Sequence, residues 1–310
     1  MVIREALSAA ARNESLGGLI SRAPLARDVV KRVVGGESAA TALGVAGDLA
    51  DRGFWVSLER AAPSVDSAEA AEAVLGEYLA LVDEVASAGL AEACEITVFA
   101  ESLGMSPDGD GNGDDARERL AALASHAAES RVAVMVGMGP AANADRTIEW
   151  VAGMQDSGLD VGMTLPAVLL RSEADCERFA DRRVRLVKGG RAAEASVAHS
   201  LPIEIDKAYV RCAKKLLRGK GDPSFATHDP RLLEILESLI ARYERPRHTY
   251  EFAFFMGRQE GAQERLLAAG ERVRVYVPYG PDWFERLVGG LAEQPSSIAA
   301  AVRSLLPGSP

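Results

Sequence analysis

Three stretches of this 310-residue sequence combine residue types that could bind an anionic ligand or take part in chemistry. They are Lys188–Gly190, Thr227–Pro230 and Tyr276–Gly280. The glycines after the lysine would let the backbone approach a ligand closely. The Asp-Pro that ends the second stretch is typical of a helix start, and helix N-termini favour anions. Each stretch also has an ordinary explanation, because a lysine can be a solvated rim charge, His228 a helix cap and Tyr276 a wall residue.

Patterns typical of other chemistry are absent from the sequence. It contains no Ser–His–Asp set, no paired carboxylates of a glycosidase and no Gly-x-Gly-x-x-Gly after a predicted strand, which argues against a Rossmann nucleotide site. Cys94, Cys176 and Cys212 lie far apart and show neither a disulfide framework nor zinc-ligand spacing. We therefore expect no metal site, and isolated thiols suit a reducing cytoplasm.

The acidic stretch 107–115 resembles the opening of a calcium-binding loop. Asp108, Asp110, Asn112 and Gly113 follow the expected spacing. The twelfth position, which needs a bidentate glutamate, is Arg119. Without that ligand we expect a solvated acidic loop that binds no metal.

Charge and hydropathy limit the class of partner. The chain has 35 Lys and Arg against 45 Asp and Glu, a net charge of −10, which argues against a general nucleic-acid partner. Arg4, Glu5 and Arg12 interrupt any signal-peptide apolar core. No window approaches the roughly 20 apolar residues that a membrane span needs. We therefore expect a cytoplasmic protein with no transmembrane segment.

The elements that position these residues follow a regular order. Eight short segments rich in Val, Ile, Leu, Phe or Tyr predict strands: Phe54–Leu58, Glu95–Phe99, Arg131–Gly137, Val161–Leu165, Arg183–Lys188, Ser224–Thr227, Tyr250–Phe255 and Arg272–Val277. Helix-like stretches lie near residues 66–90, 114–128, 141–157, 172–181, 203–218, 229–244, 258–269 and 281–294. This α/β alternation predicts a TIM-type (β/α)8 barrel over residues 46–310, with an open doubly wound sheet as the alternative. Residues 1–45 precede the alternation and predict an N-terminal helical arm.

A barrel of this kind places its site where the strands end. The polar stretches named above all lie at predicted strand ends, as do Glu59, Phe99, Gly137 and Pro166. The segment Gly189–Ser200 is long enough to act as a flap over such a site.

The order and spacing of several motifs resemble the proline dehydrogenase family. The motifs are Arg185–Gly189, Phe225–Pro230, Tyr250–Phe252 with Gly257, Tyr276–Gly280, Trp283 and Leu291–Pro295. The resemblance runs from about residue 20 to the C-terminus. It implies a (β/α)8 barrel that holds FAD non-covalently, oxidises L-proline and passes electrons to a quinone.

The cofactor side of the resemblance is mostly kept. It implies that Arg185 and Lys188, with the backbone at Gly189, contact the flavin, where a cation would stabilise the reduced anionic ring. It also implies that Thr227 and His228 hold the adenine-nucleotide portion, and that Glu293 contacts the cofactor. One position departs from the family, because Pro166 stands where the family has a glutamine beside the flavin.

The substrate side of the resemblance is largely lost. The family clamps the substrate carboxylate with two adjacent arginines, and here these positions are Gly289 and Gly290. A site lysine, an aspartate and two tyrosines correspond to Phe99, Gly137, Arg191 and Arg286. Tyr276 alone persists among the polar substrate-facing positions. Loss of the two guanidiniums removes charge-assisted hydrogen bonds of about 1.5–3 kcal/mol each.

These substitutions predict a pocket for an uncharged or bulkier ligand. Our first hypothesis is a flavoenzyme that oxidises a C–N bond of a small-molecule amine or amino-acyl substrate, without a free carboxylate, in place of free L-proline. The alternative is a catalytically inactive homologue that serves as a scaffold or binding protein. A third hypothesis is an ordinary proline dehydrogenase with a rearranged carboxylate site, for which Arg191 or Arg286 would supply the cation.

Overall fold

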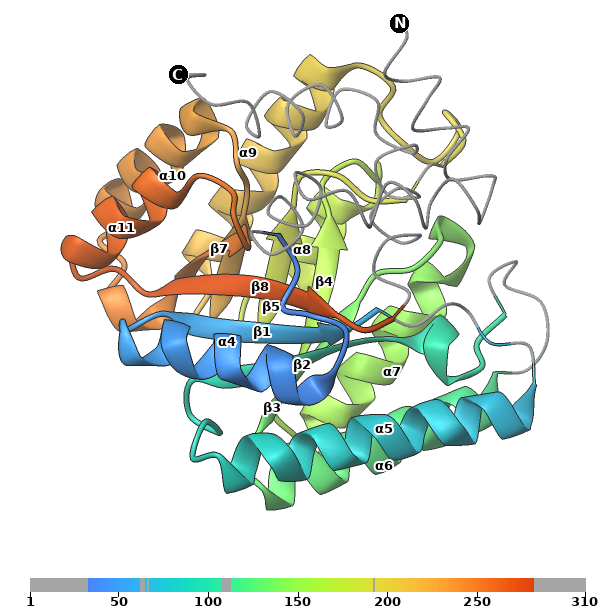
Figure 1. Ribbon diagram of the computed structural model, residues 1–310. Coiled ribbons are helices and arrows are strands. Elements are labelled where there is room, and N and C mark those ends of the chain that lie inside the picture. The colour runs from blue at the N-terminus through green and yellow to red at the C-terminus, as the bar shows by residue number, and fades with distance from the viewer. Residues whose placement is uncertain (1–32, 62–64, 66, 107–112, 192, 282–310) are drawn as a thin grey trace, which may run out of the picture.

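A computed structural model describes residues 33–61, 65, 67–106, 113–191 and 193–281, which form a closed barrel of parallel strands (Figure 1). The strands follow one another around the barrel in chain order, and the last pairs with the first. Their bounds are β1 Trp55–Arg60, β2 Cys94–Phe99, β3 Ala133–Gly137, β4 Val161–Pro166, β5 Val184–Val187, β6 Pro223–Ala226, β7 Glu251–Phe255 and β8 Val273–Tyr279. The predicted (β/α)8 barrel is confirmed, and the open doubly wound sheet is wrong.

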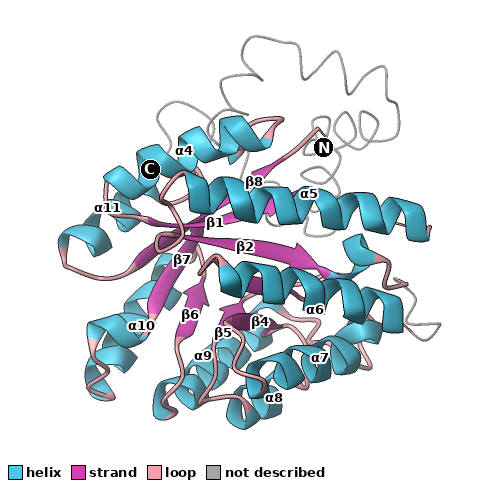
Figure 2. Ribbon diagram, turned by 90° about the horizontal axis from the view of Figure 1, so that it is seen from below, coloured by secondary structure: helices cyan, strands magenta, loops and turns pink. Residues whose placement is uncertain are grey.

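Helices surround the strands on the outside of the barrel (Figure 2). Their bounds are α4 Ala39–Asp51, α5 Ala68–Ser87, α6 Asp114–Glu129, α7 Ala144–Asp156, α8 Ser172–Arg178, α9 Pro202–Arg218, α10 Pro230–Arg242 and α11 Glu260–Ala268. Short 3-10 turns occupy η1 Ala100–Leu103, η2 Ala141–Asn143 and η3 Arg247–Thr249. Helix α10 begins as its sequence predicts, because Asp229 accepts a hydrogen bond from the Arg231 N–H and Pro230 takes the first helical position.

Apolar and polar residues alternate along the strands. The outward residues, such as Val56, Leu58, Ile96 and Val98, are fully buried in one core cluster with the inner faces of the helices. Polar side chains of β1, β2, β5 and β6 reach one another across the barrel interior. The barrel interior therefore contains a network of ion pairs and hydroxyl groups. Barrels of this type usually hold layers of branched aliphatic residues there.

Two element boundaries differ from the sequence prediction for a backbone reason. β3 starts at Ala133 and not at Arg131, because Arg131 has a φ of 56° in the turn after α6. Helix α11 starts at Glu260 and not near residue 258, because Gln259 has a φ of 55°. A left-handed residue interrupts both strand and helix geometry, and sequence patterns do not reveal it when the residue is not glycine.

Helix α4 packs against β1 and β8 and runs across residue 45, where we expected the arm to end and the barrel to begin. Its buried side chains are Ala42 and Ala46, and Ser38 and Thr41 form a reciprocal capping box at its start. Residues 1–32 of the expected arm lie outside the described residues. The division of the chain at residue 45 therefore stays a prediction.

Candidate functional site

The carboxyl ends of the strands meet at one end of the barrel, which we call the mouth. Two parts of the mouth differ in chemistry. We call the residues Phe99, Glu101, Gly137 and Gly139 the β2–β3 side. We call the residues Lys188, Thr227, His228, Phe255 and Arg258 the β5–β7 side.

On the β2–β3 side, an aromatic ring covers a glycine. Phe99 and Gly137 are register partners at the ends of neighbouring strands. A Cβ added to Gly137 would lie 2.5 Å from Phe99 Cζ, closer than side chains can pack. The two predicted substrate-side residues are therefore brought together, and the ring occupies the space that any side chain at position 137 would need.

Two residues further along, a carboxylate covers a second glycine. A Cβ on Gly139 would lie 2.5 Å from Glu101 Oε2. Glu101 is 2% exposed, and its Oε1 accepts a hydrogen bond of 2.9 Å from the Asn143 amide, which also donates to the Ser106 carbonyl. Glu101 Oε2 and Asn143 Oδ1 are buried acceptors without a hydrogen-bond donor among the described residues. No described lysine or arginine pairs with Glu101, so the residues described on this side of the mouth offer no cation to a ligand.

Tyr276 lies in β8 and faces two neighbouring strands. Its hydroxyl donates to the buried carboxylate of Glu59 on β1. The Phe255 ring on β7 meets the Tyr276 ring edge to face, with 4.9 Å between the centroids. The polar end of Tyr276 is therefore held by Glu59, and its ring forms part of an aromatic wall.

The predicted cofactor residue His228 is neutral in this setting. Its Nε2 accepts a hydrogen bond of 2.9 Å from the Phe255 N–H, which places the imidazole proton on Nδ1. Burial, with a smaller effect from the nearby Arg258 charge, lowers the pKa of His228 from 6.5 to about 3. The imidazole stacks on Phe255 at 5.5 Å, so it can donate a hydrogen bond to a ligand and carries no charge at neutral pH.

The predicted cofactor residue Lys188 follows the last residue of β5 and is already paired. Its ammonium lies 2.5 Å from Asp206 Oδ1 and 3.3 Å from Asp229 Oδ2. Hydrogen bonds from Arg231 and Lys188 lower the pKa of Asp229 to about 2, although burial opposes the shift. Thr227 is 2% exposed, and its hydroxyl accepts a hydrogen bond from the Asp229 N–H.

Arg185, also predicted to contact the flavin, points into the barrel interior. Its guanidinium donates to the Glu95 carboxylate and lies 3.4 Å from the hydroxyls of Ser57 and Ser224. Burial alone would raise the pKa of Glu95, but the charges of Arg185, Arg274 and Arg183 hold it well below its usual value. Arg185 therefore belongs to the ion network in the barrel interior, whereas Lys188, just after the end of β5, lies at the mouth.

The loop after β5 lies close to Pro166. A Cβ on Gly190 would lie 3.1 Å from the Pro166 Cβ, a tighter contact than most side chains make, and Gly189 precedes it half-buried. Arg191 is half-buried and makes no ion pair with a described residue. The end of this segment, predicted as a flap, is joined to the loop after β4 by a bridge between Leu169 and Ala198.

Four predicted site residues lie outside the described residues: Arg286, Gly289, Gly290 and Glu293. Residues 107–112 of the acidic stretch do as well. In the described part of the chain, no group of three or more His, Cys, Asp or Glu residues could hold a metal ion. Its three cysteines are buried and free, and none of its helices is long and apolar enough to cross a membrane.

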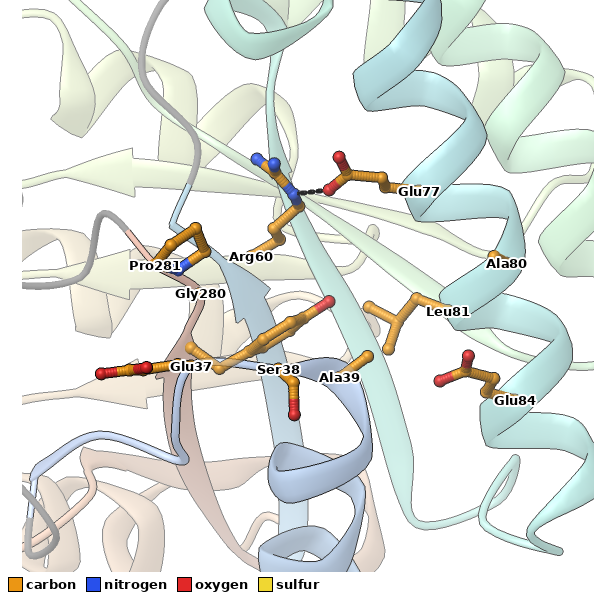
Figure 3. A pocket seen from close by; sticks show the side chains of 11 residues that line it. Glu37, Ser38, Ala39, Arg60, Glu77, Ala80, Leu81, Glu84, Gly280 and Pro281 are labelled. Atoms are coloured by element: carbon orange, nitrogen blue, oxygen red, sulfur yellow. Dashed lines mark hydrogen bonds and ion pairs between the residues drawn. The ribbon is translucent and has the colours of Figure 1, made fainter.

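A hollow of about 250 Å³ lies on the flank of the barrel between the start of α4, α5 and the end of β8 (Figure 3). Arg60 and Glu77 form an ion pair on its wall. Ligand pockets usually have volumes of about 300–1,000 Å³. This hollow is too small for a dinucleotide. Of the three candidate stretches it touches only the end of one, at Tyr279 and Gly280, so we do not assign it as the site.

Two residues of the mouth escaped the sequence analysis, Glu101 and Arg258. Glu101 sits in a 3-10 turn and not in a strand, so strand-end reasoning passed over it. Arg258 is a half-buried arginine after β7 that makes no ion pair within the described part of the chain. The absence of a partner depends on tertiary packing, and no sequence pattern signals it.

Comparison with known proteins identifies relatives over most of the chain. The family model "Proline dehydrogenase" matches residues 42–283. A proline dehydrogenase of Deinococcus radiodurans is 26% identical over 285 residues, which cover 91% of both chains. Proline dehydrogenase 1 of Bacillus subtilis is 30% identical over 244 residues, which cover 75% of this chain and 80% of the relative.

Two solved structures share the fold. Proline utilization A from Bdellovibrio bacteriovorus, inactivated by N-propargylglycine, has a TM-score of 0.77 at 19% identity over 95% of this chain. A mutant of proline utilization A from Bradyrhizobium japonicum has a TM-score of 0.73 at 20% identity over 92% of this chain. The chain spans only about a third of either protein, 34% and 33%. These structures support the barrel and nothing finer.

Proposed function

The chain belongs to the proline dehydrogenase family, and we propose that it is an FAD-dependent oxidoreductase acting on a proline-like amine other than free L-proline. The substrate we propose is a cyclic or secondary amine without a free carboxylate, or an amino-acyl group masked as an ester or thioester. A quinone is the proposed electron acceptor. A bound FAD would supply the acceptor for the hydride on the carbon next to the amine nitrogen.

The fit of Phe99 over Gly137 is the observation that carries this proposal. Where the family resemblance implies a lysine and an aspartate, this chain has Phe99 and Gly137. The large ring of the first fills the space left by the missing side chain of the second. Neither can be reverted alone without loss of contact or a clash. Such paired substitution favours a changed ligand over unconstrained decay of a site.

Charge on the β2–β3 side supports the same choice. Glu101 is a buried carboxyl group with no described cation beside it. A substrate carboxylate there would find no described counterion, and an unpaired carboxylate in a water-poor pocket costs several kcal/mol. A neutral or protonated amine is compatible with this environment.

The β5–β7 side suits a dinucleotide cofactor. Phe255 is 51% exposed and offers an apolar plane at the mouth. The Thr227 hydroxyl and the Nδ1–H of His228 are the polar groups nearby, and Gly189 leaves the backbone accessible. We propose that these residues hold FAD together with Lys188, while Tyr276 positions the amine through its ring.

A second candidate is an inactive scaffold without flavin, and one observation favours it. Both cations predicted to contact the flavin are already neutralised inside the chain, Lys188 by Asp206 and Asp229, and Arg185 by Glu95. Flavin binding has to compete with those ion pairs.

The visible spectrum of the purified protein, followed by titration with FAD, separates the two candidates. The enzyme hypothesis predicts flavin absorbance in the protein or after addition of FAD. Lys188→Ala should then lower flavin occupancy or shift the flavin potential, while Lys207→Ala, which removes a solvent-exposed ion pair with Glu204, should do neither. A colourless protein that takes up no FAD would support the scaffold.

A further inference from the structure

The turn after β7 holds a cation that no other group in the described chain neutralises. Arg258 follows Gly257 in this turn, between the end of β7 and the start of α11. It is half-buried and makes no ion pair with any described carboxylate. Burial lowers the pKa of Arg258, and no described carboxylate opposes that shift. A guanidinium that is partly desolvated without a counterion is a binding group for an anion.

Arg258 differs in this respect from Lys188, the cation that the sequence singles out. Lys188 contacts two carboxylates, and Arg231 contacts the same two, so that cluster of two cations and two anions has no net positive charge. His228 is neutral. Among Lys188, His228 and Arg258, the basic residues of the β5–β7 side, only Arg258 offers a positive charge that no described carboxylate neutralises.

The turn that carries Arg258 is held in place by hydrogen bonds on both sides. The Phe255 N–H donates to His228 Nε2, and the Gln259 side chain donates to the His228 carbonyl at 3.1 Å. Gln263 donates to the Arg258 carbonyl at 2.6 Å. These contacts hold Gln259 in its left-handed conformation, which costs of order 1–3 kcal/mol for a non-glycine residue. The backbone at Arg258 is therefore held in place without a ligand.

We propose that Arg258 is a phosphate-binding residue of the mouth and that it takes the diphosphate of FAD. A planar guanidinium can donate two parallel hydrogen bonds to phosphate oxygens, which a lysine cannot. The identity of the dinucleotide rests on the proposed function, whereas the phosphate chemistry rests on Arg258 itself. Arg258 follows β7 and Lys188 follows β5, two strands away, so the cofactor would follow β6 and β7 more than β5.

Binding titrations of the full chain with FAD, ADP and riboflavin test this assignment. Arg258→Met keeps the apolar stem and removes the charge. It should weaken the binding of FAD and of ADP roughly 10- to 100-fold. Riboflavin has no phosphate, so its affinity should stay unchanged. Arg265→Gln on α11, the helix after this turn, removes an exposed pair with Glu237 and should leave all three affinities unchanged.

A measurement on the unmodified protein covers the case in which Arg258→Met does not fold. Inorganic pyrophosphate should compete with FAD and ADP and should not compete with riboflavin. Equal FAD and ADP affinities in Arg258→Met and the unmodified protein would overturn the assignment, as would a lack of pyrophosphate competition or of any binding of FAD and ADP. Binding of ADP through Arg258 without uptake of riboflavin or FAD would instead reject the flavoenzyme and keep the phosphate site.

Discussion

The two sides of the mouth have diverged to different degrees on one scaffold. The β5–β7 side has polar groups on fixed positions, with ion pairs and hydrogen bonds around Lys188 and His228. The β2–β3 side has an aromatic ring on one glycine and an unpaired buried carboxylate on the next. Under the proposed function, cofactor binding and substrate choice reside in separate loops, so one can change while the other is kept.

Substitution in the ion network of the barrel interior, below the β5–β7 side, should cause the largest loss in the free energy of unfolding. Glu95→Ala would leave the buried guanidiniums of Arg185 and Arg274 without one of their carboxylates and should lower the free energy of unfolding by about 3–5 kcal/mol. Glu264→Ala, which removes a half-exposed pair with Arg52, should cost at most about 1 kcal/mol. Urea denaturation of both variants checks this. Equal losses would mean that the network does not depend on Glu95.

Substitution of Gly137 on the β2–β3 side should cause the next largest loss of stability. Gly137→Ala forces a Cβ against the Phe99 ring and should destabilise the fold by about 1–3 kcal/mol. The control is Gly153→Ala on α7, where an added Cβ meets nothing within 4 Å. This variant should be more stable to unfolding by about 0.5–1 kcal/mol. Thermal and urea unfolding measure both. A neutral Gly137→Ala would show that the ring and the glycine are not matched.

Restoring the arginine pair should have a moderate effect. Gly289→Arg with Gly290→Arg should improve L-proline binding by about tenfold, close to 1.4 kcal/mol, because a carboxylate partner returns. Turnover should stay low unless Phe99 and Gly137 are changed to Lys and Asp as well. Proline binding by calorimetry and flavin reduction in the double and quadruple variants measure this. Full activity in the double variant would remove Phe99 from substrate choice.

The pH dependence of His228 should have little effect at neutral pH and appear only as the solution becomes acidic. Its pKa is about 3 in the folded protein against 6.5 ordinarily, so the unfolded chain binds more protons between these values. Stability should therefore be fully present above pH 6.5 and fall as the pH drops toward 3, by at most about 1.4 kcal/mol per unit. His228→Gln should reduce this slope in urea titrations at pH 7, 6 and 5. An unchanged slope would mean that His228 titrates normally.

The sequence was sufficient for the barrel because alternation of strands and helices is a local pattern repeated eight times. It also located Lys188, His228, Phe99 and Gly137 at the mouth, since strand ends fix their place. It did not show that Glu95 draws Arg185 into the interior, because that contact joins residues 90 positions apart. Nor did it reveal Arg258, whose significance is a missing partner and therefore a property of the folded chain.

Anaerobic mixing of the FAD-loaded protein with L-proline and, separately, with L-prolinamide tests the central claim most directly. The two compounds share the ring and the reacting C–N bond. L-Proline carries a charged carboxylate, and L-prolinamide carries an uncharged amide in its place. We predict that prolinamide reduces the flavin faster, and that millimolar L-proline bleaches it slowly or not at all. Rapid bleaching by L-proline would contradict the account and would mean that its carboxylate is held elsewhere, with Arg191 and Arg286 the first residues to test.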